Sequence, residues 1–452
     1  MAKARIEKAP LFDLQKLNLA EVIPHFSSYG VVDNKGRYLH WSKLKWYLSS
    51  SLSRAEQENI WFAIKMKRQA MSSILPFESC NEFKFNYCTP DVIVSKLHEI
   101  DKSTGAYGGD LSGKTTTDQI QKKYLVSSLI MEEAITSAQL EGASTTREVA
   151  KKMLIDGREP NGEDERMIIN NYLLLKKAKE YKKEELSIEL ILSFHETATI
   201  GTVENKVIPG EFRKSDDIYV EDGDGGIAHQ PPAYNGISTR LKMICDFANQ
   251  SHLGTDGSPF IHPIIKAIIL HFMIGYEHPF RDGNGRTARA IFYWFMLKSG
   301  YDLFEFVSIS KLLREEPRKY GEAYLYSERD QNDLTYFIDY NLDIIIKSIN
   351  DLKLYLKREK DEFISVLTMM EKNEKLSKLS FHQKEIIKKG IKHPGIIFTA
   401  KGIEREYSIS NNAARNALNT LVNKQILLST TEGKITIYIA PGDLKERLSY
   451  DG

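Results

Sequence analysis

Residues 278–289 read HPFRDGNGRTAR and separate two almost wholly apolar segments. The segment before them, PIIKAIILHFMIGYE (263–277), opens with Pro263, which suits a first helical turn. The segment after them, TARAIFYWFMLKSG (287–300), ends at Gly300, a residue type that commonly follows the last turn of a helix. We therefore predict two buried helices, with the polar stretch at the start of the second.

The polar stretch has the composition of an anion site. Its glycines let the backbone approach a ligand closely, and the dipole of the following helix adds about half a positive charge at the helix N-terminus. Arg286 and Arg289 stand three residues apart, so both project from one helical face and can hold different phosphates of one polyphosphate. The pattern predicts a binding site for the phosphates of a nucleotide.

Two further side chains of the stretch add chemistry. Asp282 is a lone carboxylate, which suits Mg²⁺, an ion that keeps most of its waters and takes one or two protein oxygens together with phosphates. His278 has an ordinary pKa of about 6.5, so it is mostly neutral at pH 7 and can take a proton from a hydroxyl. A calcium-binding EF-hand loop is disfavoured because Arg286 falls where an oxygen ligand belongs.

A second phosphate motif competes with this site. Residues 108–115, GGDLSGKT, match the P-loop pattern G-x-x-x-x-G-K-[ST]. A P-loop follows a buried strand, whereas residues 92–107 have the pattern of a helix and a loop. We therefore rank a P-loop NTPase, with Lys114 on the phosphates, as the third interpretation of the function.

The polar stretch resembles the signature of Fic-domain proteins, H-P-F-x-[DE]-G-N-G-R followed by a second arginine three residues later. PGEFR (209–213) and HQPPA (229–233) are similar to neighbouring segments of that family, and the resemblance covers residues from about 120 to 345. It implies a mainly α-helical fold with a small β-hairpin. It also implies an enzyme that uses ATP and Mg²⁺ to transfer AMP to a Ser, Thr or Tyr hydroxyl of a target protein or of itself.

The resemblance implies a role for each polar residue of the stretch. His278 would deprotonate the target hydroxyl, and Asp282 would hold Mg²⁺. The implied nucleotide-binding residues are Gly283, Asn284, Gly285, Arg286 and Arg289. The glycine turn would form the anion cradle, and the two arginines would hold the outer phosphates. Relatives that transfer other groups have Ala and Lys within this turn, so the intact turn indicates AMP transfer.

Residues 210–232 are expected to form a two-stranded hairpin whose loose tip is the acidic, glycine-rich stretch 222–225. The segment resembles the flap with which Fic-domain proteins pair an extended piece of the target. Its first strand, around Ile218, Tyr219 and Val220, would offer an open edge that binds backbone without demanding a particular sequence. An ordinary surface hairpin is the alternative.

Residues 131–145, MEEAITSAQLEGAST, contain the end of a predicted helix that runs from about 118 to 142, with Gly142 as its cap. Glu141 then lies in the last turn, where the negative end of the helix dipole disfavours it and an arginine is the natural partner. A glutamate that is merely solvated is the alternative.

Ser137, Glu141 and Gly142 resemble the inhibitory motif [ST]-x-x-x-E-[GN] of Fic-domain proteins. The resemblance implies that Glu141 pairs with Arg289 and blocks the outermost phosphate, so that the chain inhibits itself. In some relatives the same glutamate also serves the removal of AMP from the target. The sequence leaves both roles open.

The chain divides into four expected regions. They are 1–115, a mostly helical N-terminal region; 116–350, the Fic core with its inhibitory helix; 351–380, a helical linker; and 381–452, a winged helix-turn-helix domain. Within the first region we predict a short hairpin around residues 34–36 and a helix that begins after Ser53 and continues to about Leu75.

The C-terminal region has eleven Lys and Arg against seven Asp and Glu, a small positive excess. Its pattern is three helices followed by a hairpin, with Ser410 as the cap of the third helix. Side chains that can read bases gather on or near the exposed side of that helix: Asn411, Asn412, Arg415, Asn416 and Asn419. DNA binding through residues 399–440 is one expectation; docking of a protein, or a homodimer, is the other.

Composition narrows the class of protein. The 452 residues carry a formal net charge of +1, which argues against a chain that binds polyanions along its whole length. No apolar run approaches the roughly 20 residues of a membrane span, so we expect a cytoplasmic protein without membrane contact. The rival function is a DNA-binding regulator in which the nucleotide pocket acts as a sensor and turnover is incidental.

Overall fold

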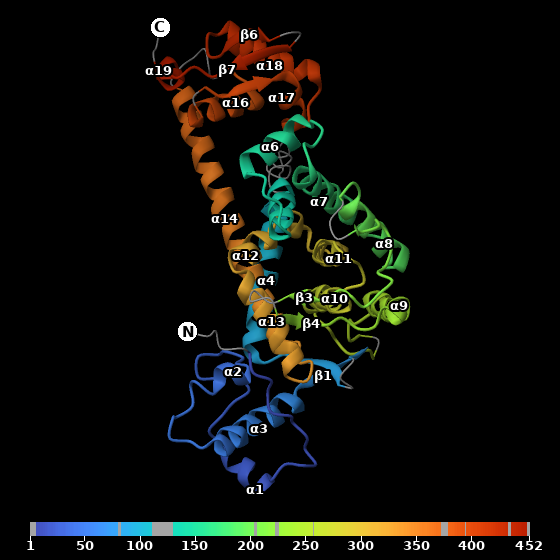
Figure 1. Ribbon diagram of the computed structural model, residues 1–452. Coiled ribbons are helices and arrows are strands. Elements are labelled where there is room, and N and C mark those ends of the chain that lie inside the picture. Colours follow the sequence, from blue (N-terminus) through green and yellow to red (C-terminus); the bar gives the residue numbers. More distant parts are fainter. Residues whose placement is uncertain are drawn as a thin grey trace. The chain divides into compact units, whose positions relative to one another are not determined.

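The computed structural model describes residues 6–79, 83–110, 130–202, 206–221, 226–255, 257–371, 378–393, 395–432 and 435–449. The chain forms two compact units, both mainly helical as predicted (Figure 1). The first comprises Met1–Gly105, Glu133–Ser144 and Asn161–Ser348, and the second comprises Ala106–Glu132, Thr145–Pro160 and Ile349–Gly452. Among the described residues, no helix combines the length and the apolar character that crossing a membrane requires.

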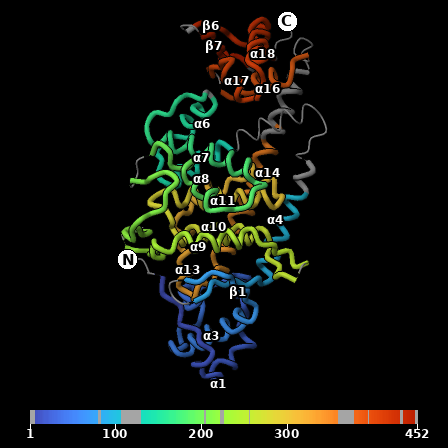
Figure 2. Tube along the Cα trace, turned by 90° about the vertical axis from the view of Figure 1, so that its right-hand side faces the viewer, coloured from blue at the N-terminus to red at the C-terminus, as the bar shows by residue number. Residues whose placement is uncertain are grey.

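The two predicted apolar helices form the centre of the first unit. α10 (Pro263–Glu277) has the predicted bounds, and nearly all of its side chains are buried. α11 (Asn284–Lys298) begins three residues earlier than predicted, because the left-handed Gly283 ends the loop and the next residue is already helical. The two helices pack directly against each other, as both views show (Figures 1 and 2).

Further helices of the first unit surround this pair. α7 (Glu163–Glu180) and α8 (Ile188–Thr199) pack against α11, and α9 (Ile237–Asn249) packs against α10. After α11 follow η4 (Asp302–Glu305), α12 (Ile309–Glu315), α13 (Pro317–Arg329) and α14 (Thr335–Glu371). α14 includes most of the predicted helical linker, of which residues 372–377 lie outside the described part of the chain.

The N-terminal region differs from prediction in two places. α3 (Arg54–Ala70) begins with the expected cap, a capping box of Ser53 and Glu56, but it ends at Ala70 rather than near Leu75. The next residues form β1 (Ser72–Glu78), which pairs antiparallel with β2 (Lys84–Cys88). The helix prediction ran too far because Leu75 and Phe77 alternate with exposed residues, the period of a strand.

The predicted hairpin around residues 34–36 is also wrong. The segment is a turn in which Asp33 N–H donates to the Arg37 carbonyl at 3.1 Å, with Gly36 at φ 74° and no strand on either side. The Arg37 side chain forms an ion pair with Asp33, and this local contact, rather than backbone hydrogen bonds between two strands, holds the turn. The other elements of this region are α1 (Leu19–Val22), η1 (Ile23–His25), α2 (Trp41–Leu44) and α4 (Asp91–Asp110).

The P-loop interpretation fails because α4 is a helix where a P-loop requires a strand. Residues 111–115 of the match lie outside the described residues, as does the start of the predicted 118–142 helix. From 130 to 140 the chain is helical, as predicted, and Gly142 follows with φ 105°.

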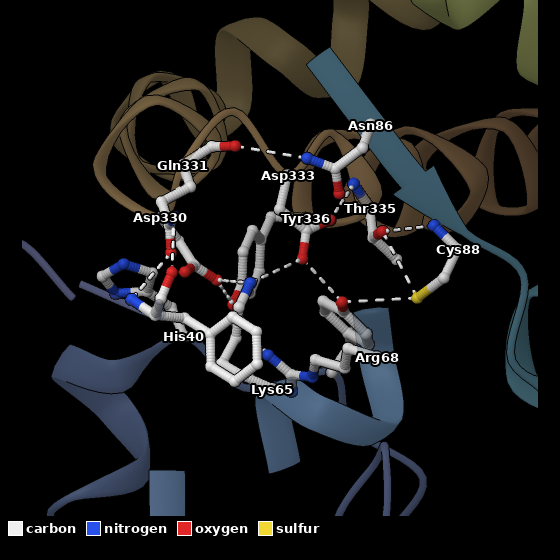
Figure 3. A network of polar contacts seen from close by, with 12 residues as sticks. His40, Lys65, Arg68, Asn86, Cys88, Asp330, Gln331, Asp333, Thr335 and Tyr336 are labelled. Atoms are coloured by element: carbon white, nitrogen blue, oxygen red, sulfur yellow. Dashed lines mark hydrogen bonds and ion pairs between the residues drawn. The ribbon is translucent and has the colours of Figure 1, made fainter. Parts of the chain in front are cut away.

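A buried polar network joins the N-terminal region to the junction of α13 and α14 (Figure 3). Lys65 Nζ lies 2.9 Å from Asp330 Oδ2 and 3.6 Å from Asp333 Oδ2. Arg68 donates to the Tyr336 hydroxyl at 2.8 Å, and that hydroxyl donates to Asp330 at 2.7 Å. Two cations and two carboxylates therefore neutralise one another away from water. Removing any one of these side chains would leave an unpaired buried charge, which is strongly destabilising.

Among its described residues, the second unit combines helices with a three-stranded antiparallel sheet, in the order β5-β7-β6. Its elements are α16 (Phe381–Lys392), β5 (Ile397–Thr399), α17 (Ala400–Tyr407), α18 (Asn411–Asn423), β6 (Leu428–Glu432), β7 (Ile435–Ile439) and α19 (Leu444–Ser449). α6 (Arg147–Asp156) belongs to the same unit and packs against α17. Ser410 caps α18 as predicted, whereas β5 and α19 were not predicted.

Candidate active site

His278 ends α10 in a left-handed conformation, with φ 43° and ψ 56°. Its Nδ1 lies 3.3 Å from the Gly275 carbonyl oxygen. Because a carbonyl oxygen can only accept, Nδ1 carries the proton and Nε2 keeps its lone pair. Burial lowers the pKa of His278 to about 4, so the ring is neutral at pH 7. The side chain is therefore able to accept a proton at Nε2.

Arg213 fixes the backbone beside this histidine. Its buried side chain donates from Nε to the His278 carbonyl at 3.0 Å, from Nη1 to the Ser215 carbonyl at 3.0 Å, and from Nη2 to the Pro232 carbonyl. Its own N–H donates to the Pro279 carbonyl at 2.9 Å. One buried cation thus joins the 278–285 loop to both ends of the 213–232 segment.

His195, from α8, supports the turn of the loop. Gly210 N–H donates to its Nδ1 at 3.0 Å, so its proton lies on Nε2, which donates to the Asp282 carbonyl at 3.0 Å. Its ring also stacks on Phe280, with centroids 3.7 Å apart. Gly283 must be glycine here, because its φ is 80° and a Cβ atom would meet the His195 ring at 3.3 Å.

Asn284 closes the loop on itself. Its Oδ1 accepts from Phe280 N–H at 3.0 Å, and its Nδ2 donates to the Phe280 carbonyl at 2.9 Å. The amide group is therefore engaged within the loop. What the turn offers an anion is the backbone N–H groups at the N-terminus of α11, which have no partner within the helix.

The loop lines a cavity of about 450 Å³. The lining residues are Glu141, Asp217, Ile218, Tyr219, Glu221, His278, Arg281, Asp282, Gly283, Asn284 and Gly285. The structure thus brings together the predicted base, metal ligand and glycine turn, the glutamate of the predicted inhibitory motif, and two of the three predicted flap residues.

Glu141 lies beside Gly285 in this cavity. Its Oε1 accepts from Arg289 Nη2 at 2.7 Å, while the Ser137 hydroxyl accepts from Arg289 Nε at 3.0 Å. Although burial raises the pKa of Glu141, the charges of Arg289 and Arg286 outweigh it and hold that pKa below its ordinary value. A methyl group on Gly285 would overlap the Glu141 carboxylate. The carboxylate therefore occupies space next to the turn that a bound anion would need.

The two arginines of α11 are both held by carboxylates of the chain. Arg286 is buried, donates to the Ala198 carbonyl at 2.9 Å and contacts the Asp282 carboxylate. Arg289 is equally buried and is held by Glu141. Neither side chain is among those that line the cavity. Both could reach phosphates only by exchanging these carboxylates for them.

The predicted flap is a shorter hairpin than expected. β3 (Val220–Glu221) pairs with β4 (Ile227–His229), and Ile218 and Tyr219 precede the paired residues. Residues 222–225, the predicted tip, lie outside the described part of the chain. The His229 ring anchors β4, with one nitrogen 2.8 Å from Glu328 Oε1 and the other 2.7 Å from the Tyr276 carbonyl.

Residues 185–296 match the model of the Fic/DOC family. The matched residues include α8, the flap, α10 and the 278–285 loop. These residues are a Fic domain.

Two curated relatives of this Fic domain are similar over a larger part of the chain. "Protein adenylyltransferase Fic" of Drosophila willistoni is 28% identical over 243 residues, which is 53% of this chain and 44% of that protein. The protein of the same name from Drosophila ananassae is 26% identical over 249 residues, 54% of this chain and 47% of that protein. The alignments therefore span less than half the length of these relatives.

A solved structure shares the fold. A Fic family protein from Desulfovibrio desulfuricans aligns with a TM-score of 0.50 at 17% sequence identity, covering 79% of this chain and 98% of that one. At this identity the similarity concerns the arrangement of the helices. It agrees with the mainly helical fold that the sequence predicted.

The polar groups around residues 278–285, called the Fic loop below, fit a magnesium ion that is bound mainly by phosphates. Asp282 is a carboxylate on the cavity wall, and Mg²⁺ commonly takes one or two such oxygens with the rest from phosphates and water. In the described part of the chain, no cluster of three or more His, Cys, Asp and Glu side chains could hold a metal by itself. The residues suit an ion that arrives with a nucleotide.

Two residues that support the Fic loop were not predicted from the sequence. His195 and Arg213 hold the loop through backbone carbonyls more than 60 residues away in the chain. Arg213 is the last residue of PGEFR, which is similar to a segment of the family, but that similarity does not say which atoms the Arg213 side chain contacts. Their roles depend on which carbonyl each side chain faces, and no local pattern predicts that.

Proposed function

We propose that the chain is a protein adenylyltransferase that transfers AMP from ATP to a Ser, Thr or Tyr hydroxyl. The observation that carries the proposal is that one cavity is lined by His278, whose Nδ1 faces a carbonyl so that Nε2 is free of a proton, by Asp282, and by residues at the N-terminus of α11. The names of the aligned relatives support it. The acceptor lies on a partner protein or on the chain itself.

In the proposed reaction, the acceptor oxygen attacks the α-phosphorus of ATP. The new O–P bond forms as the bond from the α-phosphorus to the oxygen bridging to the β-phosphate breaks, and pyrophosphate leaves. The hydroxyl proton moves to Nε2 of His278. Charge on the leaving phosphates is stabilised by the α11 N-terminus, with Arg286 and Arg289 once each has released its carboxylate. Mg²⁺, held by Asp282, supplies further neutralisation of the phosphates when bound.

We propose that Ser137, Glu141 and Gly142 inhibit this reaction in cis. The Glu141–Arg289 pair supports this role, because it removes the cation that would hold the outermost phosphate. Gly142, at φ 105°, turns the chain away directly after the glutamate. Removal of the carboxylate would free Arg289 without disturbing the loop itself.

Intact-mass spectrometry after incubation with ATP and Mg²⁺ tests both proposals. We expect an adduct of one AMP on the Glu141→Gly protein, little on the wild type, and none on Glu141→Gly combined with His278→Ala. If no form gains an adduct and no protein in a cell lysate is labelled from α-labelled ATP, adenylylation is refuted. Loss of the adduct after ATP is removed, in a form that retains Glu141, would show that this glutamate also serves AMP removal.

The second candidate is a DNA-binding regulator with a nucleotide-sensing pocket. We propose that residues 381–452 are a winged helix that contacts DNA through α18. Asn412, Arg415 and Asn416 are exposed on that helix. Asn411 and Asn419 are less suited, because their amides bind Glu404 and the Tyr438 hydroxyl. A duplex mobility-shift assay with Arg415→Ala tests contact, and His278→Ala separates the candidates: a sensor keeps nucleotide-dependent DNA affinity, whereas an enzyme loses its product.

A further inference from the structure

Arg281, at the position that the Fic signature leaves unspecified, forms a two-pronged ion pair with the flap segment. Its Nη1 lies 3.2 Å from Asp217 Oδ1, and its Nη2 lies 3.1 Å from Asp217 Oδ2. Nη1 also donates to the Ser215 hydroxyl at 3.3 Å. A planar guanidinium that meets both oxygens of one carboxylate fixes direction as well as distance, which a lysine could not do.

The pair connects two walls of the cavity. Arg281 lies between the buried Phe280 and the candidate magnesium ligand Asp282, so its backbone belongs to the rigid part of the loop. Asp217 lies three residues before β3. Both side chains line the cavity, together with Ile218 and Tyr219 from the flap and His278 from the loop.

Other side chains also attach the flap segment, and one of them, Arg213, binds the carboxylate of Asp216 next to Asp217 at 2.6 Å. Arg213 binds carbonyls at Ser215 and Pro232, and His229 holds β4 to Tyr276 and Glu328. The Arg281–Asp217 pair acts nearer to the open edge, where an acceptor segment would add to β3.

The charge of Arg281 is already balanced before any nucleotide binds. Hydrogen bonding from Ser215 and the charge of Arg281 lower the pKa of Asp217 to about 2, so the carboxylate is ionised at any working pH. The phosphates have a separate set of donors, namely the α11 N-terminus, Arg286 and Arg289. The geometry thus favours a role toward the acceptor over a role as a phosphate ligand.

We propose that the Arg281–Asp217 pair is a positioning device that sets the flap edge against His278 and so delivers the acceptor hydroxyl to its Nε2. This inference rests on the proposed adenylyltransferase function. The pair controls the rate of transfer and leaves the affinity for the nucleotide almost unchanged.

The test compares five variants on the active Glu141→Gly background. They are Arg281→Gln, Asp217→Asn, Arg281→Asp, Asp217→Arg and the charge swap Arg281→Asp with Asp217→Arg. We measure the rate of self-adenylylation by intact mass, and the affinity for a non-hydrolysable ATP analogue with Mg²⁺ by calorimetry. Each single variant is expected to lose about tenfold or more in rate, because small misplacements of reacting groups are costly, with less than about a twofold change in affinity.

The charge swap and a matched control make the outcome decisive. The swap is expected to recover the rate to within about threefold of the parent, since it restores the pair in reverse. Lys214→Gln breaks an exposed flap ion pair with Glu211 and should leave the rate unchanged. The proposal is overturned if Asp217→Asn keeps the parental rate while Arg281→Gln weakens nucleotide binding, or if the swap is no faster than the single variants.

Hydrogen exchange of the peptide that covers residues 214–221 provides a measurement that does not depend on catalytic activity. We expect faster exchange in Arg281→Gln and Asp217→Asn, and near-parental exchange in the swap. Unchanged exchange in the single variants would overturn the positioning role even if no adduct forms on the parent. An absent adduct on the parent, by contrast, counts against the adenylyltransferase function and not against the pair.

Discussion

In the proposed transfer, His278 acts as a base only while Nε2 is unprotonated, so its pKa would set the acidic limit of the reaction. Burial lowers this pKa to about 4, and the ring is therefore neutral across the physiological range. Glu141 is one of the groups that raise it, so removing Glu141 shifts the pKa further down. The ring has to be neutral to accept the proton, so activity is present above this pKa and is lost as the pH falls through it.

For the Glu141→Gly protein, we accordingly expect the transfer rate to stay level between about pH 5 and pH 8, since a base of low pKa is already unprotonated throughout. Initial rates at saturating ATP in buffers of constant ionic strength provide the measurement. An acidic limb centred near 6.5, the value of an ordinary histidine, would show that the ring is not buried as described.

His195 gives a second prediction for a single side chain. His195→Phe keeps the stacking on Phe280 but leaves the Gly210 N–H and the Asp282 carbonyl without their partner. An unpaired group costs up to about 1–3 kcal/mol when fully buried, and these two are partly buried, so we expect a somewhat lower free energy of unfolding in urea and a large loss of transfer rate. A variant with parental stability and rate would mean that the two hydrogen bonds do not hold the loop.

At the scale of elements, the helix over 130–140 is attached by more than its last turn. Glu133, Ser137 and Glu141 are spaced by four residues, so all three lie on one helical face. Glu133 accepts from the Ser308 hydroxyl at 2.7 Å and from Ser310 N–H at 3.1 Å, at the start of α12. Glu141, the glutamate of the proposed inhibitory motif, is thus the outermost of three contacts along a single stripe.

From this stripe we expect Glu133→Gln to weaken inhibition in a protein that keeps Glu141. Gln retains the shape of the side chain but replaces one accepting oxygen by an amide NH₂, so hydrogen bonds donated by Ser308 or Ser310 are lost. The transfer rate should rise severalfold, and the same substitution on the Glu141→Gly background should add nothing further, because the two act in series. Equal increases on both backgrounds would place the effect of Glu133 outside the inhibitory helix.

Elements that depend on interactions between residues close in the sequence were predicted more accurately than contacts between residues far apart in the sequence. α10 and the start of α3 depend on local apolar pattern and on caps such as Ser53, which the sequence displays directly. β1 was missed because its alternation of buried and exposed residues is short. The pairing of Glu141 with Arg289 was expected only through resemblance, since 148 residues separate them.

At the scale of the whole molecule, the chain has two units, each with its own buried core. The core of the C-terminal unit includes Ile387, Leu418 and Tyr438, from α16, α18 and β7. All four tryptophans, Trp41, Trp46, Trp61 and Trp294, belong to the first unit. Tryptophan fluorescence therefore reports on the first unit alone, whereas far-ultraviolet circular dichroism reports on both.

Leu418→Ala is expected to separate the unfolding of the two units. Leu418 is fully buried, and its truncation should destabilise the second unit by about 2–5 kcal/mol. In urea, circular dichroism should then show an earlier first transition, while the midpoint measured by tryptophan fluorescence stays at its parental value. Leu270→Ala, in the buried α10, is the matched control and should move the fluorescence midpoint instead. If Leu418→Ala shifts both probes together, the two units unfold as one cooperative body.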